Sequence, residues 1–368
     1  WFGNLDYRKL VRPDEGRYAE IPREMVASGD WLTPRLNGIK YFEKPPLQYW
    51  ATAAAYEVFG EHHWTVRLWP AATGFAGIVL TYFIGAMLFG ALAGLYAALI
   101  LASSLGYVLV AHVATLDMGL TFFMTLTLGG LLIGLRQRAP PAKNRLWMHV
   151  AWAGMALAAL SKGLIGVALP VMVLGAYIAL QRDFGVLRRL HLWTGGLLFL
   201  AIAAPWFVAV SIANPGFFDF FFIHEHFQRF MTDEHRRPGP WWYFFPILAL
   251  TILPWLGILC DALPRSWKAR GAAAEFQPQR LLVLWAVLIF AFFSASGSKL
   301  PSYIMPVFPA LALLMGLYLS ERHATTLRWH LAPLPVLGVV IMALAPQAVR
   351  FASDEVPVVL YDAYVPWL

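Results

Sequence analysis

The residues best suited to chemistry lie near the start of the chain, in a segment rich in charges. Asp14 comes first, Arg17 follows three residues later, and Lys44 stands directly before Pro45 and Pro46. A carboxylate beside a guanidinium stays ionised and can stabilise a cationic centre or accept a proton, while an ammonium before a helix start suits a phosphate. Loops have no folding need for so many charges, so we expect this segment to form part of an active site.

Asp14 has two compatible interpretations. It follows Pro13 at the start of a helix predicted over 15–28, which suits the N-cap position. The third residue after it, however, is Arg17, where a capping box would have Glu or Gln. Helical spacing places Asp14 and Arg17 side by side, so that Arg17 holds Asp14 ionised and can also face a phosphate.

Lys44 also has two interpretations. Proline favours an extended residue before it and suits a first helical turn, which predicts a helix over 47–59. The positive N-terminus of that helix and Lys44 would together bind a phosphate at the membrane surface. The alternative is an interfacial lysine whose ammonium reaches the headgroups. Tyr41 and Glu43 flank Lys44 and are candidates for bonding to a phosphate or a sugar amine.

Further candidates lie where apolar segments meet. Asp117 either caps the apolar segment that it opens or lines a wet cavity, because an unpaired acid at this depth is costly. Lys162 is interpreted as a plain turn lysine. Lys299 and Tyr303 place a charge and a hydroxyl at the same outer boundary, and their alternative is a lysine reaching the headgroups beside a tyrosine of the aromatic belt.

A second polar segment, 212–240, contains His224, Glu225, His226 and Arg229. Histidines two residues apart point to different sides of a helix, so we do not predict a metal site there. Arg229 is four residues from Glu225, which suits a helical ion pair, and its forked donor set also suits a phosphate. The sequence indicates no cofactor and leaves a metal requirement open.

These residues must be held by a membrane-spanning bundle. The 368 residues are 59% hydrophobic and only 13% charged, which is typical of an all-α polytopic membrane protein and not of a soluble enzyme. Ten apolar segments suit membrane-crossing helices, several of them at the short limit of about 17 residues. They cover approximately 68–89, 92–112, 118–135, 147–161, 164–180, 193–211, 241–260, 281–297, 301–319 and 331–349.

The charges of the connecting segments predict the orientation. Alternate connections, near 90, 136–146, 181–192, 261–280 and 320–330, contain 13 Lys/Arg against 4 Asp/Glu, whereas the rest of the chain has 15 against 17. By the positive-inside rule the first set is cytoplasmic. The acid-rich set then faces the periplasm or lumen, and we divide the chain into a loop on that side with interfacial helices (1–67), a transmembrane bundle of about ten helices (68–349) and the start of a further segment on that side (350–368); in a bacterium both outer segments would be periplasmic. The scattered basic residues argue against a nucleic-acid surface, and the single Cys260 excludes an internal disulfide.

The charged segment resembles a known family. The runs Asp14-Glu15-Gly16-Arg17-Tyr18-Ala19-Glu20, Gly29-Asp30-Trp31 and Phe42-Glu43-Lys44-Pro45-Pro46-Leu47 are similar to those of the aminoarabinose transferases of bacterial inner membranes. These belong to the GT-C glycosyltransferases, whose wider relatives include protein O-mannosyltransferases. The resemblance is specific over residues 13–50, and Asp117, Arg229 and 298–306 add weaker matches.

The resemblance implies a fold, a reaction and residue roles. The fold is a GT-C helical bundle, and the reaction moves 4-amino-4-deoxy-L-arabinose from undecaprenyl phosphate to a lipid A phosphate at the periplasmic face of the inner membrane, giving polymyxin resistance. Asp14 is then the catalytic candidate, with Lys44, Arg229 and Tyr303 as donor-phosphate contacts. The remaining cavity residues, of less defined role, are Arg17, Tyr41, Asp117 and His224. Family members have more transmembrane helices and a C-terminal periplasmic domain, so we expect this chain to be part of a longer protein.

Two other functions stay open from the residues. The nearer one keeps the fold but uses another polyprenyl-phosphate sugar and a protein or lipopolysaccharide acceptor. The other is a secondary transporter, whose signature would be ionisable groups near the middle of the spans and two matching halves. The ionisable groups here collect at one membrane face, which favours an enzyme.

Overall fold

The computed structural model describes residues 1–11, 13–136, 141–222, 239–268, 276–322, 330, 333–352 and 358–359. Over these ranges the regular secondary structure is helical except for one two-stranded hairpin, β1 (Arg35–Leu36) and β2 (Ile39–Lys40). Asn37 and Gly38 connect these strands with positive φ angles of 54° and 75°, as a tight hairpin turn requires. The predicted all-α membrane fold is confirmed.

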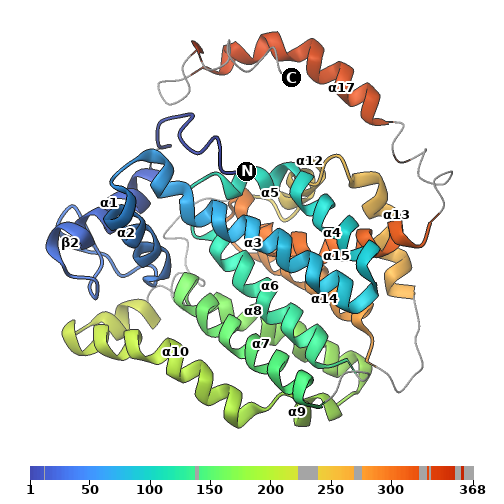
Figure 1. Ribbon diagram of the computed structural model, residues 1–368, viewed down its shortest axis with the longest axis horizontal. Coiled ribbons are helices and arrows are strands. Elements are labelled where there is room, and N and C mark those ends of the chain that lie inside the picture. Colours follow the sequence, from blue (N-terminus) through green and yellow to red (C-terminus); the bar gives the residue numbers. More distant parts are fainter. Residues whose placement is uncertain are drawn as a thin grey trace.

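Two short helices form a layer outside the bundle. These are α1 (Asp14–Ser28) and α2 (Leu47–Phe59), close to the predicted ranges, and they lie together at the left of Figure 1. Their apolar faces meet because Tyr18, Ile21 and Met25 of α1 pack against Tyr49 and Ala53 of α2. Gly29 ends α1 with a φ of 70°, a conformation that glycine adopts without strain.

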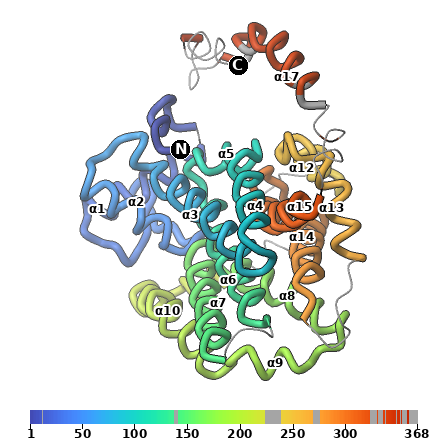
Figure 2. The backbone as a smooth tube through the Cα atoms, turned by 45° about the vertical axis from the view of Figure 1, so that its right-hand side comes forward, coloured from blue at the N-terminus to red at the C-terminus, as the bar shows by residue number. Residues whose placement is uncertain are grey.

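The remaining helices form the bundle and its attachments. Their bounds are α3 (His63–Phe89), α4 (Ala91–Ser103), α5 (Leu105–Ala111), α6 (Asp117–Gly134), α7 (Pro141–Lys162), α8 (Ile165–Gln181), α9 (Gly185–Arg189), α10 (Leu192–Ala213), α12 (Phe244–Thr251), α13 (Leu256–Lys268), α14 (Pro278–Ala295), α15 (Phe308–Ser320) and α17 (Pro333–Leu344), with the 3₁₀ helices η2 (Pro301–Val307) and η3 (Ala345–Phe351). Figure 2 shows α1 and α2 at one side of the bundle and α9 at its lower end.

Five helical stretches in the described ranges are long and apolar enough to cross a membrane: α3, α6, α10, α14, and η2 with α15. The number rises to seven if α4 with α5 and α12 with α13 each form one bent span. These pairs bend by 65° and 112°, so the apolar segments at 92–112 and 241–260 are each broken. Pro254, between α12 and α13, lacks the N–H that a continuous helix needs. The sequence-based count of about ten spans stays a prediction.

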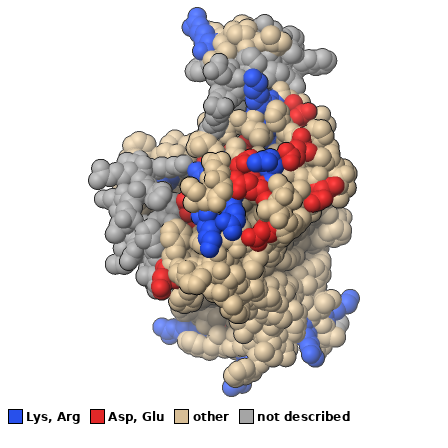
Figure 3. Space-filling view, turned by 90° about the vertical axis from the view of Figure 1, so that its left-hand side faces the viewer, with Lys and Arg blue, Asp and Glu red and all other residues tan. Residues whose placement is uncertain are grey.

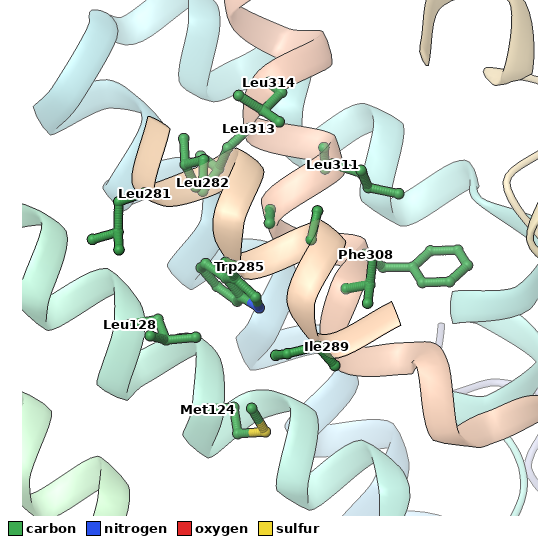
Figure 4. Packing of buried hydrophobic residues seen from close by; sticks show 14 of the residues in the cluster. Met124, Leu128, Leu281, Leu282, Trp285, Ile289, Phe308, Leu311, Leu313 and Leu314 are labelled. Atoms are coloured by element: carbon green, nitrogen blue, oxygen red, sulfur yellow. The ribbon is translucent and has the colours of Figure 1, made fainter. Parts of the chain in front are cut away.

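The core forms around α6 and α15. In α6, 89% of the most apolar stretch is buried, against 17% in α10, whose exposed side chains would face lipid. Trp285 of α14 faces Leu128 of α6 in Figure 4, and its indole nitrogen donates to the Pro306 carbonyl at 2.7 Å. Gly130 allows α6 to approach α7, since a Cβ there would lie 2.9 Å from the Trp147 carbonyl oxygen.

Candidate active site

Glu15 anchors the start of α1 from inside the protein. Its side chain has no exposed area and accepts hydrogen bonds from Arg8, from Arg67 at 2.9 and 3.1 Å, and from the backbone N–H groups of Val11 and Ala114 at 2.8 and 3.0 Å. Burial disfavours the carboxylate, but these donors outweigh it and hold the pKa of Glu15 at about 2. Glu15 therefore joins the N-terminal segment, α1, α3 and the turn before α6. The sequence offered no signal for pairing it with Arg67, which is 52 residues away.

Asp14 is the neighbour of Glu15 but faces a different environment. Pro13 occupies the N-cap position and Asp14 is the first helical residue, so the carboxylate is not the cap. Its Oδ1 lies 3.5 Å from Nη2 of Arg17, and 36% of the Asp14 side chain is exposed. The predicted pairing of Asp14 with Arg17 is confirmed.

Arg17 continues the site toward the second half of the layer. Its Nη1 donates to the Tyr41 hydroxyl at 3.1 Å, and that hydroxyl donates to Oε2 of Glu43 at 3.0 Å. Burial, together with the charge of Glu43, raises the pKa of Tyr41 well above its usual value, so the phenol keeps its proton at neutral pH. The Lys44 ammonium donates to the Glu43 carbonyl at 2.7 Å, directly before α2 begins. Arg17, Tyr41, Glu43 and Lys44 are thus brought together as the sequence predicts.

A second group of polar residues comes from the bundle. Asp117, the first residue of α6, is only 5% exposed and accepts a hydrogen bond from Lys162 at the end of α7. The Lys162 ammonium also lies 4.6 Å from the ring centre of Tyr303 in η2. The interpretation of Lys162 as a plain turn lysine is wrong, because it pairs with Asp117 and contacts Tyr303.

Tyr18 connects the two groups. Burial raises the pKa of its phenol well above the usual value. The Tyr18 ring stacks on Tyr49 at 6.2 Å, and the Arg17 guanidinium lies 6.0 Å from its centre. Tyr18 therefore contacts Arg17 of its own helix and shares an apolar cluster with Leu116, the residue directly before Asp117.

The other predicted residues differ in what the structure says of them. The Lys299 ammonium donates to the carbonyls of Ser294 and Ser296 at 2.8 and 2.9 Å, so it caps the end of α14. Arg229 and His224 lie outside the described residues. Among the residues that the structure describes, no three His, Cys, Asp or Glu side chains gather to hold a metal ion.

Comparison with known proteins identifies the family. Residues 1–268 match the family described as dolichyl-phosphate-mannose-protein mannosyltransferase, and the chain belongs to it. The chain is 37% identical over 359 residues to the undecaprenyl phosphate-alpha-4-amino-4-deoxy-L-arabinose arabinosyl transferase of Pseudomonas aeruginosa, covering 94% of this chain and 62% of that protein. It is also 37% identical over 315 residues to such a transferase of Pseudomonas fluorescens, covering 84% of this chain and 52% of that one. The resemblance to aminoarabinose transferases is thus confirmed.

Solved structures support the same assignment. The crystal structure of ArnT from Cupriavidus metallidurans bound to undecaprenyl phosphate superposes with a TM-score of 0.91 at 43% identity, covering all of this chain and 66% of that one. An oligosaccharyltransferase of Archaeoglobus fulgidus shares the fold, with a TM-score of 0.56 at 14% identity, covering 99% of this chain and 53% of that one. The chain spans about half to two thirds of the length of these relatives.

Proposed function

We propose that this member of the mannosyltransferase family transfers 4-amino-4-deoxy-L-arabinose from undecaprenyl phosphate to a phosphate of lipid A. The observation that carries the proposal is the connected arrangement of Asp14, Arg17, Tyr41, Glu43 and Lys44 in the layer outside the bundle. Relatives with that activity in their names share 37% of the residues over most of this chain.

The donor phosphate would bind between the outer layer and the bundle. Lys44 comes just before the positive N-terminal end of α2. The Arg17 guanidinium is joined to it by hydrogen bonds through Tyr41 and Glu43. Tyr303 would add a hydroxyl, and Arg229 is the further cation predicted for this phosphate. Such fixed cations stabilise the second negative charge that develops on the leaving phosphate more than they stabilise the singly charged phosphodiester donor.

The transfer step follows from the charges. An oxygen of the acceptor phosphate attacks the anomeric carbon, the bond from that carbon to the donor oxygen breaks, and undecaprenyl phosphate leaves with the electron pair. The acceptor phosphate is already anionic, so no base has to remove a proton. Asp14 is partly exposed beside Arg17 and would stabilise the oxocarbenium-like sugar or orient its amino group.

The site would face the periplasm and the protein would lie in the bacterial inner membrane. Figure 3 shows acidic and basic side chains together over the α1–α2 layer. The charged side chains visible at the lower end of this view are all basic. That asymmetry supports the orientation predicted by the positive-inside rule, with the basic end in the cytoplasm.

A protein acceptor is the second candidate, because the matched family is described as a protein mannosyltransferase. A hydroxyl acceptor must lose a proton, and Asp14 would then act as a general base. Mass spectrometry of lipid A from cells with and without the full-length protein distinguishes transfer to lipid A from transfer to a protein. Loss of an aminoarabinose mass from lipid A supports the first reaction, and an unchanged lipid A profile contradicts it.

The donor site has its own test in Lys44→Ala. Removing a charged contact to a phosphate costs roughly 1.5–3 kcal/mol, so affinity for undecaprenyl phosphate should fall about 10- to 100-fold while the fold persists. Lys40→Ala is the matched control, because Lys40 lies on the exposed hairpin strand β2. Equal affinities of the Lys44 variant and the wild-type protein would remove Lys44 from the phosphate site.

A further inference from the structure

Helix α2 contains buried polar atoms that have no hydrogen-bond partner. Gln48, Tyr49 and Thr52 are at most 1% exposed. Within the described part of the chain, no partner is present for either amide atom of Gln48, the Tyr49 hydroxyl or the Thr52 hydroxyl. The Thr115 hydroxyl, two residues before Asp117, has the same property.

Such a concentration is unusual because buried polar groups are nearly always paired. Nearby buried groups follow that rule: the Thr65 hydroxyl donates to the His62 carbonyl at 2.7 Å, and every oxygen of Glu15 accepts. Gln48 and Thr52 are four residues apart and so lie on one face of α2. The unpaired atoms are therefore confined to one place on a helix that is otherwise well packed.

That place adjoins the candidate active site. Gln48 is the second residue of α2 and lies four positions after Lys44 in the sequence. Tyr49 stacks on Tyr18, whose ring centre lies 6.0 Å from the Arg17 guanidinium of the candidate site. Leu116, next to Thr115, packs in the same apolar cluster as Tyr18 and Tyr49. The unpaired atoms thus lie on a helix that packs directly against Tyr18 and α1 beside the residues proposed for the phosphate.

We propose that Gln48, Tyr49 and Thr52 form the subsite for the sugar ring of the lipid-linked donor, a proposal that rests on the function above. An amide and two hydroxyls offer both donors and acceptors without charge, which matches the hydroxyl and amino groups of a sugar and not a phosphate. The three side chains are buried in the structure. Sugar binding opens the packing of α2 locally and supplies the missing partners.

The unpaired state provides a sharp test. Removing an unpaired polar atom leaves stability unchanged or raises it, so Gln48→Leu and Thr52→Val should not lower the Tm of the purified full-length protein. The same variants should bind undecaprenyl phosphate that carries the amino sugar at least about 10-fold and about 5-fold more weakly, respectively. Their affinity for bare undecaprenyl phosphate should not change.

Thr81→Val is the matched control for Thr52→Val. Thr81 is fully buried in the middle of α3 and its hydroxyl is also unpaired, but it lies away from the candidate site. Its variant should show the same stability and normal binding of both lipids.

Two outcomes would contradict the proposed sugar subsite. A fall in Tm for Gln48→Leu or Thr52→Val would mean that structural water already pairs these atoms, and unchanged affinity for the sugar-bearing lipid would mean that the sugar lies elsewhere. Neither result affects the proposed function, which fails separately if the wild-type protein binds neither lipid.

Discussion

Glu15→Gln should destabilise the protein strongly although it removes only one charge. The pKa of Glu15 falls from its ordinary 4.5 to about 2 in the folded protein, and a change of this size corresponds to about 3 kcal/mol of stability at neutral pH. The estimate agrees with the roughly 3–5 kcal/mol expected when one member of a buried ion pair is removed. The glutamine amide would leave Arg8 and Arg67 without their counter-charge. Its NH₂ group, itself a donor, would face groups that also donate hydrogen bonds.

Thermal unfolding of the purified protein measures the effect. For a chain of this length about 3 kcal/mol corresponds to a fall in Tm of about 4 °C. Glu20→Gln is the control, because Glu20 pairs with Arg23 at the surface and should contribute at most about 1 kcal/mol. Glu15 has a lowered folded-state pKa, so its contribution is complete above pH 4.5 and is lost as the pH falls toward 2.

The difference in Tm between wild type and Glu15→Gln should therefore be constant from about pH 6 to 8 and shrink in acid. Equal Tm values at neutral pH, or a loss no greater than that of Glu20→Gln, would refute the argument that Glu15 anchors α1.

The remaining predictions concern the site and its orientation. Asp14→Asn should lower turnover by roughly 10²–10⁴ with donor binding retained, and wild-type polymyxin resistance at equal expression would exclude a chemical role. Lys162→Met leaves Asp117 buried without its cation and should cost roughly 3–5 kcal/mol, measured by Tm, whereas the double change with Asp117→Asn should recover most of the loss. A cysteine at Asn37 should react with an impermeant thiol reagent from the periplasm, and labelling only after membrane lysis would reverse the orientation.

The sequence predicted the elements well and their breaks poorly. Periodicity and proline placement located α1 and α2 within a few residues, because local spacing decides where an amphipathic helix begins. Hydropathy cannot detect a bend inside an apolar stretch. The break between α4 and α5 falls at Ser104, whose extended backbone has no signature in the surrounding apolar residues.

In the candidate site, too, only features that are local in the sequence could be predicted. Asp14 with Arg17, and Tyr41 with Glu43, were predictable because each pair is close in the sequence. Pairings over long separations were not: Lys162 reaches Asp117 across 45 residues, and nothing local distinguishes it from a turn lysine. Only the folded bundle brings the end of α7 to the start of α6.

Asp14 and Glu15 show how one short motif supports both stability and chemistry. Neighbouring residues on a helix point about 100° apart, so the same first turn of α1 directs one carboxylate inward and the other outward. Glu15 is saturated by two arginines and two backbone donors, and a group held in this way cannot take part in a reaction. Among the residues that the structure describes, Asp14 has one long contact, at 3.5 Å to Arg17, and could exchange it for a substrate. The inner residue holds the helix in place, so that under the proposed function the outer one would meet the sugar in a defined position.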